Sequence, residues 1–279
     1  MKGSCFAVVV MMLLCLACGG HKTGRMTVET TEDSLPADSD LVKADEESII
    51  ADEPMPLAAD ELFDDFIFNF AANKKLQMER IVFPLAEDLY GRADSMKSRQ
   101  WQMDYFFMKQ GFYTLLFNSS DEMAVVKDTS LREAIVEKIF LDDDYVKQYH
   151  FKRIRGRWML CLLREQHLSK NANATFLSFY KRFVTDSAFQ MESLANQIEF
   201  VGPDPDDDFS QMEGVILPEY WDVFAPELPD GVLYNIVYGK EGPETDNKVF
   251  VLRGIANGLE MEMTFSRKSG QWKLTKLIT

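Results

Sequence analysis

The residue types that carry most metal and nucleophilic chemistry are scarce in this chain. Its 279 residues include four cysteines and three histidines. His21, His150 and His167 form no cluster with the spacing of a zinc site, and none has a candidate Ser or Cys nucleophile in a recognisable context. The sequence also lacks glycine-rich phosphate loops and the paired-histidine helix of zinc proteases. We therefore expect no metal, no cofactor and no set of catalytic residues.

No apolar run is long enough to cross a membrane as a helix. The run Phe6–Leu16 has 11 residues, whereas a bilayer core takes about 20. Lys2 precedes this run and small residues follow it, which is the layout of a secretory signal. We expect residues 1–17 to be a signal peptide.

A cysteine lies where the signal ends. The residues Leu16-Ala17-Cys18-Gly19 resemble the lipobox of bacterial lipoproteins, in which the cysteine after the small residue is lipidated and becomes the new N-terminus. The resemblance implies that Cys18 is the lipidated residue; Cys15 has leucines on both sides and fits less well. The alternative is ordinary cleavage after Ala17, which would leave a soluble periplasmic protein.

The residues that follow Cys18 bear on where the anchor lies. Gly19, Gly20 and His21 include neither the aspartate that retains such lipoproteins in the inner membrane nor the early acidic run of a surface-export tag. By the same resemblance, we expect a protein of the bacterial cell envelope, anchored in the outer membrane and facing the periplasm.

The segment after the signal is strongly acidic. Between Thr27 and Leu62 there are twelve acidic residues against the single Lys43. Such a composition cannot bury enough apolar surface to offset the entropy of ordering, so 18–59 is predicted to be a disordered tether. From Phe63 to Thr279, 26 bases stand against 33 acids, a net charge of −7. This balance makes nucleic acid a poor partner.

Two local features could be mistaken for sites. Cys161 is the one cysteine left after the signal and the lipid site, and its position in an alternating segment favours a packed strand residue over a nucleophile. The acidic run Asp142–Asp144 is interpreted as a solvated turn rather than a calcium site.

An internal repeat organises the remainder of the chain. Six residues recur in the same order 113 positions later, which composition alone does not explain. They are Phe63, Phe66, Phe70, Gln77, Met78 and Glu79, repeated as Phe176, Phe179, Phe183, Gln190, Met191 and Glu192. We interpret the chain as a tandem duplication, with domains at 60–168 and 169–279.

Each copy is predicted to begin with an amphipathic helix and to end in a hairpin. The phenylalanines lie at helical spacing, and Asp60 and Asn173 are candidate N-cap residues. Gly156 and Gly270 are predicted in tight turns between alternating strands. The segment 132–140 has helical propensity, but its repeat counterpart is rich in β-branched residues and leads to Asn257-Gly258, so a strand is predicted.

The closing motif identifies a family resemblance. Phe-x-Arg-x-x-Gly-x-Trp-x-Leu at 151–160 and 265–274, after one or two helices and several strands, is similar to nuclear-transport-factor-2-like domains. The whole chain also resembles two-domain lipoproteins of unknown function from Bacteroidota-type bacteria. The resemblance implies an α+β fold of two cone-shaped domains, each a helix packed on a curved antiparallel sheet, with the two domains packed on each other.

The repeat also selects the candidate site residues. Gln77 and Glu79, with Gln190 and Glu192, are expected either to make the same helix-end hydrogen bonds in both copies or to face a cavity. In the second case Glu79, Tyr180 and Glu192 are the candidate ligand-binding residues. The phenylalanine stripes are assigned to the core.

Two functions fit these observations. The first is a lipid-anchored binding or scaffold protein without catalysis, whose partner is a protein, a glycan or a small apolar ligand. The second is an acid–base enzyme of isomerase or dehydratase type, with a cavity in the C-terminal copy around Tyr180 and Glu192. A roomy cavity with a buried Glu192 favours the enzyme, whereas collapsed, aromatic-filled cones favour the binding module.

Overall fold

A computed structural model of the chain describes residues 60–279 except residue 205. The described residues belong to one compact unit. The expected signal peptide at 1–17, the lipid site Cys18 and the tether at 18–59 lie outside the described residues. None of the helices from residue 60 onward has the length and apolar character needed to span a bilayer.

The N-terminal segment, residues 60–168, contains two helices followed by short 3-10 helices and six strands. Its elements are α2 (Phe63–Ala72), α3 (Lys74–Glu79), β1 (Ile81–Leu89), β2 (Arg92–Met96), η2 (Ser98–Gln100), η3 (Phe106–Lys109), β3 (Phe112–Phe117), η4 (Ser120–Lys127), β4 (Glu133–Phe140), β5 (Tyr145–Ile154) and β6 (Arg157–His167).

The C-terminal segment, residues 169–279, repeats this order closely. After η5 (Leu168–Lys170), which joins the segments, it contains α4 (Ala174–Thr185), α5 (Ser187–Glu192), β7 (Leu194–Asp204), β8 (Asp207–Ile216), η6 (Pro218–Tyr220), α6 (Trp221–Phe224), β9 (Val232–Tyr238), β10 (Asn247–Gly254), β11 (Glu260–Lys268) and β12 (Gln271–Ile278).

The predicted amphipathic helices are confirmed. In α2, the phenylalanines at 63, 66 and 70 are at most 1% exposed. In α4, those at 176, 179 and 183 are at most 8% exposed. The spacing of three and four residues places each stripe on one helix face, which packs against the sheet.

Of the two predicted N-caps, Asp60 is wrong, and Asn173 has the predicted position without a capping bond. Leu62 occupies the N-cap position of α2, and Asp60 instead forms a buried ion pair with Arg80 at 2.8 Å. Asn173 does stand at the N-cap of α4 but makes no capping bond, because its side-chain oxygen accepts from the Lys248 ammonium at 2.5 Å. In both places a buried cation is a stronger partner than a helix amide.

The strand predicted at 132–140 is confirmed as β4, in spite of its helical propensity. Strands β5 and β9 pair with it on both edges, so tertiary pairing decides its conformation. The acidic run at 142–144 is the predicted turn between β4 and β5. Gly156 and Gly270 occupy turns with φ of 82° and 80°, as expected for glycine.

The connection at Asn257-Gly258 is longer than the two-residue hairpin turn that this residue pair favours. Strand β10 ends at Gly254 and β11 begins at Glu260, which leaves a five-residue loop. The Asn257 side chain accepts a hydrogen bond from the Leu259 amide at 3.2 Å. This bond stabilises a wider loop than a type I′ turn would form.

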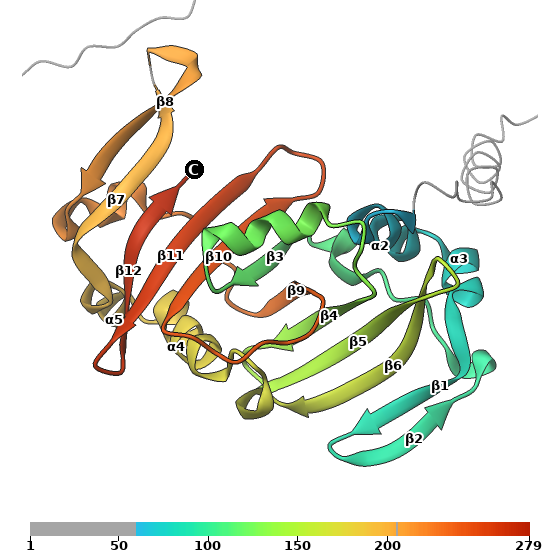
Figure 1. Ribbon diagram of the computed structural model, residues 1–279. Helices are drawn as coiled ribbons and strands as arrows, with labels where there is room; N and C mark the ends of the chain where they lie inside the picture. The colour runs from blue at the N-terminus through green and yellow to red at the C-terminus, as the bar shows by residue number, and fades with distance from the viewer. Residues whose placement is uncertain (1–59, 205) are drawn as a thin grey trace, which may run out of the picture. The chain divides into compact units, whose positions relative to one another are not determined.

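The twelve strands of the described residues form one sheet in the order β2-β1-β6-β5-β4-β9-β3-β10-β11-β12-β7-β8. Figure 1 shows the β1–β2 hairpin (cyan) at one end of this series and the β7–β8 hairpin (orange) at the other. Most neighbours are antiparallel, while β1 with β6, β7 with β12, and β3 with β9 are parallel.

The order of the central strands reveals an exchange between the two segments. Strand β9 of the C-terminal segment pairs with β4 over seven residues, and β3 of the N-terminal segment pairs with β10 over six. The exchanged strands β3 and β9 meet each other at one pair, Thr114 with Asn235. The sequence does not predict this interleaving.

The exchange gives the sheet two cores. In β9, Tyr234 and Ile236 belong to the first core, around α2, while Leu233 belongs to the second core, around α4. In β10, Val251 lies in the first core and Phe250 in the second. Because successive strand residues point to opposite faces, the two cores lie on opposite faces of the central strands.

Both cores are built with closely similar aromatic contacts. The guanidinium of Arg153 lies 4.9 Å from the Trp158 ring centroid, and that of Arg267 lies 5.0 Å from Trp272. Each tryptophan also packs edge-on against the first phenylalanine of its segment's helix, at 5.0 Å in the N-terminal segment and 5.4 Å in the C-terminal segment.

Candidate functional site

A recess with several convergent polar groups lies beside the first core. This recess, which we call the tyrosine pocket after Tyr105, Tyr149 and Tyr234, has a volume of about 440 Å³. That volume lies within the range of small-molecule sites. One wall is the segment 100–106, and the opposite wall comes from β4, β5, β6 and β9. Because Tyr234 belongs to β9, both segments of the chain build the pocket.

Asp104 is held in this pocket by a network that begins at Gln77. The Gln77 amide donates to the Asp104 carbonyl at 2.7 Å, and its side-chain oxygen accepts from the Asp104 N–H at 3.2 Å. The carboxylate accepts the Phe106 N–H at 2.8 Å and a short hydrogen bond from the Tyr149 hydroxyl. Both carboxylate oxygens are therefore engaged.

The backbone next to Asp104 is strained. Phe106 has a φ of 47°, which a bulky side chain rarely adopts, and the residue is 3% exposed. The Phe106 N–H that Asp104 accepts is held by this conformation. Strain of this kind is often retained where a loop positions a binding group.

Two tyrosines of the pocket, Tyr149 and Tyr234, are neutral at physiological pH. Burial raises the pKa of Tyr149 well above its usual value, and the neighbouring Asp104 charge raises it further. Burial and the same charge raise the pKa of Tyr234. Phenols of raised pKa keep their protons. The Tyr149 proton is donated to Asp104, so Tyr234 is the phenol of this pair that can donate to a ligand.

Two lysines complete the strand wall of the tyrosine pocket. Lys138 of β4 and Lys147 of β5 stand directly opposite each other in the antiparallel register, and both line the recess. The Lys138 ammonium lies 5.4 Å from the Tyr234 ring centroid, and that of Lys147 lies 5.4 Å from the Tyr149 ring centroid.

A second recess, the seam pocket, lies where the two segments meet and has a volume of about 310 Å³. Lys248 lines it and is 2% exposed. Its ammonium donates to the side-chain oxygens of Asn118 at 2.7 Å and Asn173 at 2.5 Å, which join β3 to α4. Burial lowers the pKa of Lys248. These contacts indicate a structural role in joining the segments.

A fully buried carboxylate lies between the exchanged strand β9 and the N-terminal segment. Glu137 accepts hydrogen bonds from the side-chain amides of Gln148 at 2.9 Å, Asn171 at 2.5 Å and Asn235 at 2.8 Å. Burial raises the pKa of Glu137, while the three amide donors act in the opposite direction. Glu137 thereby connects β4, β5, the junction after η5 and β9.

The structure does not bring the three candidate site residues together. Glu79 and Glu192 end α3 and α5 and are exposed. Tyr180 is fully buried in α4, where its hydroxyl donates to the Pro229 carbonyl at 3.0 Å and its ring stacks on Phe250 at 4.8 Å.

Glu192 lines a third recess, of about 460 Å³, with Phe189 and Trp272. We call it the helix pocket because α4 and α5 contribute to it. It is lined by aromatic rings and polar residues of the C-terminal segment, and Tyr180 is not among them.

The repeated glutamines do make the same bonds in both segments. Gln77 donates to the Phe70 carbonyl at 2.9 Å and accepts from the Trp101 indole at 3.1 Å. Gln190 donates to the Phe183 carbonyl at 3.1 Å and accepts the corresponding indole, that of Trp221, at 3.0 Å. The structural interpretation of these glutamines is confirmed.

Sequence reasoning missed Asp104, Tyr149 and the two lysines. Two sequence signals point toward these residues. The alternation along β5 places Lys147 and Tyr149 on one face, and the repeat identifies Gln77, which forms hydrogen bonds with Asp104. The acid itself is not repeated in the C-terminal segment. Asp104 lies three residues after Trp101, and the equivalent position, three residues after Trp221, is Phe224.

The described residues contain no group of three or more histidine, cysteine or acidic side chains arranged to hold a metal ion. Cys161 is a free, half-buried thiol on β6.

Comparison with known proteins places this geometry in a family. The family model described as a domain of unknown function (DUF4348) matches residues 42–279. A crystal structure of an NTF2-like protein from Bacteroides fragilis NCTC 9343 is 41% identical, with a TM-score of 0.72, and the match covers 81% of this chain and 98% of that one. No curated protein matches the chain. Given these matches and its α+β fold with one large sheet, the chain belongs to the DUF4348 family of NTF2-like proteins.

Proposed function

We propose that this chain is a lipid-anchored binding protein of the bacterial cell envelope, and that it holds a small, largely apolar ligand in the tyrosine pocket without catalysis. The observation that carries this proposal is a pocket of about 440 Å³ whose polar groups are already fixed. Preformed donors on aromatic walls are typical of small-molecule sites, whereas a glycan or protein partner would need a broader surface.

The arrangement of Asp104 favours binding over catalysis. A general base must be free to accept a proton from its substrate. Both Asp104 oxygens already accept hydrogen bonds, from the Phe106 amide and the Tyr149 hydroxyl. These bonds give Asp104 a positioning role toward Tyr149, and each carboxylate oxygen keeps a second lone pair.

An acid–base enzyme remains the second candidate function, with its site moved to the N-terminal segment. The observation in its favour is the Asp104–Tyr149 pair, a carboxylate and a phenol of raised pKa at one pocket. The originally expected site in the C-terminal segment has less support, because Glu192 is exposed and the Tyr180 hydroxyl is occupied by Pro229.

The proposed architecture is a tandem of two NTF2-like domains, 60–168 and 169–279, that have exchanged their third strands. The shared element order and the matched tryptophan contacts of the two segments support it. Such a pair would satisfy within one chain the sheet pairing that separate NTF2-like domains make as dimers.

The proposed location is the outer membrane, facing the periplasm, through a lipid on Cys18 and an acidic tether at 18–59. Multiple acyl chains on one cysteine hold firmly to a bilayer, at about 0.8 kcal/mol for each buried methylene. The chain should partition into the detergent phase, and Cys18→Ser should move it to the aqueous phase. An aqueous wild-type chain with an unmodified thiol at Cys18 would exclude the anchor.

The binding proposal is tested by mass spectrometry of the chain purified from the cell that makes it. We expect a bound small molecule that is absent after Met103→Trp, because Met103 lines the tyrosine pocket and a larger ring would fill it. The control is Met212→Trp, since Met212 is 42% exposed on β8 and distant from the pocket lining. A molecule that both variants retain would show that the ligand binds elsewhere.

A further inference from the structure

We infer that the tyrosine pocket takes an organic anion, whose acidic group lies between Lys138 and Lys147 and whose apolar body lies against the aromatic wall. This inference rests on the proposed function, in which the pocket binds a small ligand, and it adds the chemical class of that ligand.

The first argument is the register of β4 and β5. Lys138 and Lys147 form a directly opposed cross-strand pair, and like charges in such a pair destabilise a sheet. The next residues in the same row are Tyr234 on β9 and Glu165 on β6. An anion between the two ammonium groups would remove the repulsion.

The second argument is that the two ammonium groups are only weakly paired with protein carboxylates. Lys147 has Glu165 at 3.9 Å, the outer limit of an ion pair. Among the described residues, Lys138 makes no ion pair with a carboxylate; its ammonium lies over the rings of Phe140 and Tyr234. Asp104 lines the same recess, but it forms no ion pair with either lysine; its carboxylate is bound by the Phe106 amide and the Tyr149 hydroxyl.

The third argument is that the fold does not require these lysines. The β10–β11 pair of the C-terminal segment has the same register, and there Leu252 stands opposite Met261. Both residues are buried, with 5% and 3% of their surface exposed. A leucine and a methionine are therefore compatible with this position in the sheet, so the paired charges in the tyrosine pocket point to a ligand.

The remaining walls define the rest of the ligand. Trp101, Phe106 and Leu163 line the pocket and offer an apolar surface. Tyr234 is a neutral donor next to Lys138 and can hydrogen-bond the acidic group. A carboxylate or sulfonate on an aromatic or aliphatic body matches this combination.

The test uses two dyes that share one aromatic body. Anilinonaphthalene sulfonate carries an anionic group, and phenylnaphthylamine is the same skeleton without it. Each dye is titrated into the purified chain by fluorescence, and the indole N–H resonance of Trp101 reports whether it binds in the tyrosine pocket. The variant Lys138→Leu/Lys147→Met installs the residues of the β10–β11 pair, and Lys152→Met, an exposed position of β5 outside the pocket lining, is the control.

We expect the sulfonate dye to shift the Trp101 resonance and to bind the wild type about 10-fold more tightly than the neutral dye. The double variant should weaken the sulfonate dye by about 10-fold or more for each lysine removed, since hydrogen bonds to charged groups have this magnitude. Its affinity for the neutral dye should not fall. Lys152→Met should change neither dye, and Lys138→Arg should retain the sulfonate preference.

The outcomes separate the two proposals. Equal affinity for both dyes with a shifted Trp101 resonance, or a double variant that keeps the sulfonate preference, overturns the anion inference and leaves pocket binding intact. If neither dye shifts the Trp101 resonance, the proposed ligand site itself is wrong and the anion inference is wrong with it. Single Lys138→Gln is measured as well, so that a folding defect of the double variant does not decide the result.

Discussion

Replacing Glu137 with glutamine should leave the protein as stable as the wild type at neutral pH, or more stable. The carboxylate is fully buried, and its two oxygens accept hydrogen bonds from three side-chain amides. In Glu137→Gln, the remaining oxygen can still accept from Gln148 and Asn171. The new amide then faces the Asn235 amide, and a flip of Asn235 supplies an acceptor. The flip places the Asn235 NH2 where its oxygen has no partner in the wild type, so one unpartnered buried group replaces another.

Replacement by leucine should have the opposite effect. Glu137→Leu leaves the amides of Asn171 and Asn235 without these acceptors, whereas Gln148 keeps its bond to Glu241 at 2.7 Å. Two unsatisfied buried donors cost about 1–3 kcal/mol each, so the free energy of unfolding should fall by about 2–6 kcal/mol. The glutamine variant should differ from the wild type by less than about 1 kcal/mol at pH 7.

The raised pKa of Glu137 determines how the stability of the wild type changes with pH. Because burial raises the pKa of Glu137 above the value of 4.5 for a free side chain, the native state holds the proton more tightly than the unfolded state. The contribution of this group to stability is greatest below pH 4.5 and is lost as the pH rises through the folded pKa. Each pH unit over which this happens lowers stability by about 1.4 kcal/mol.

Urea denaturation of the three proteins from pH 5 to pH 8, followed by tryptophan fluorescence, measures these differences. The stability of Glu137→Gln relative to the wild type should increase with pH and then level off. A glutamine variant that is as unstable as Glu137→Leu at pH 8 would refute the reasoning, since it would show that the ionised carboxylate is net stabilising.

Three further perturbations test the fold and the site. Asp60→Ser keeps a good capping side chain but leaves Arg80 buried without its partner, so we expect a loss of about 3–5 kcal/mol in urea denaturation; a loss below about 1 kcal/mol would return Asp60 to a capping role. Segments 60–168 and 169–279, expressed separately, should each fail to fold and should recover a dispersed NMR spectrum when co-expressed, because each lacks a strand that the other supplies; a folded single segment contradicts the exchange. Tyr149→Phe should change the Trp101 resonance of the free protein and weaken dye binding, and unchanged binding would remove this hydroxyl from the site.

Local features of the fold were predictable because they depend on neighbouring residues. Helical spacing identified α2 and α4, and the repeat corrected the assignment of 132–140 from helix to strand. The exchange of β3 and β9 was not predictable in this way. Both strands bury residues on two faces, so their sequences indicate burial but not which strand lies alongside.

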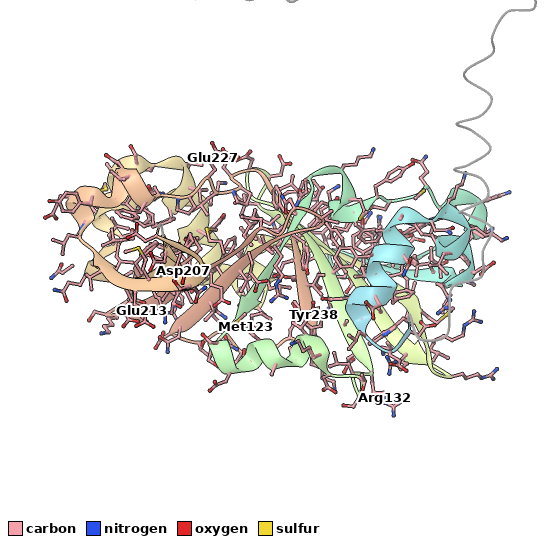
Figure 2. All side chains as sticks on the ribbon, turned by 90° about the horizontal axis from the view of Figure 1, so that it is seen from above. Met123, Arg132, Asp207, Glu213, Glu227 and Tyr238 are labelled. Atoms are coloured by element: carbon pink, nitrogen blue, oxygen red, sulfur yellow. The ribbon has the colours of Figure 1, made fainter. Side chains whose placement is uncertain are left out.

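In the candidate site, too, local features were predictable from the sequence and non-local pairing was not. Gln77 was identified as a repeated hydrogen-bonding residue, and it does hold the loop at Asp104. The tyrosine pocket itself depends on Tyr234, which reaches it through the strand exchange, and on Lys138, whose role follows from the register with β5. Figure 2 labels Tyr238, another residue of β9, which lies beside the green strands of the N-terminal segment and pairs there with Ala134 of β4. Residue spacing along the sequence does not predict non-local pairing of this kind.

A crystal structure of the chain with the molecule that it carries from its own cell tests the account most directly. We predict density in the tyrosine pocket, bounded by Trp101 and Tyr234, with an acidic group within hydrogen-bond distance of the Lys138 ammonium. Density in the seam pocket or the helix pocket, with the tyrosine pocket filled by its own side chains, would contradict the account.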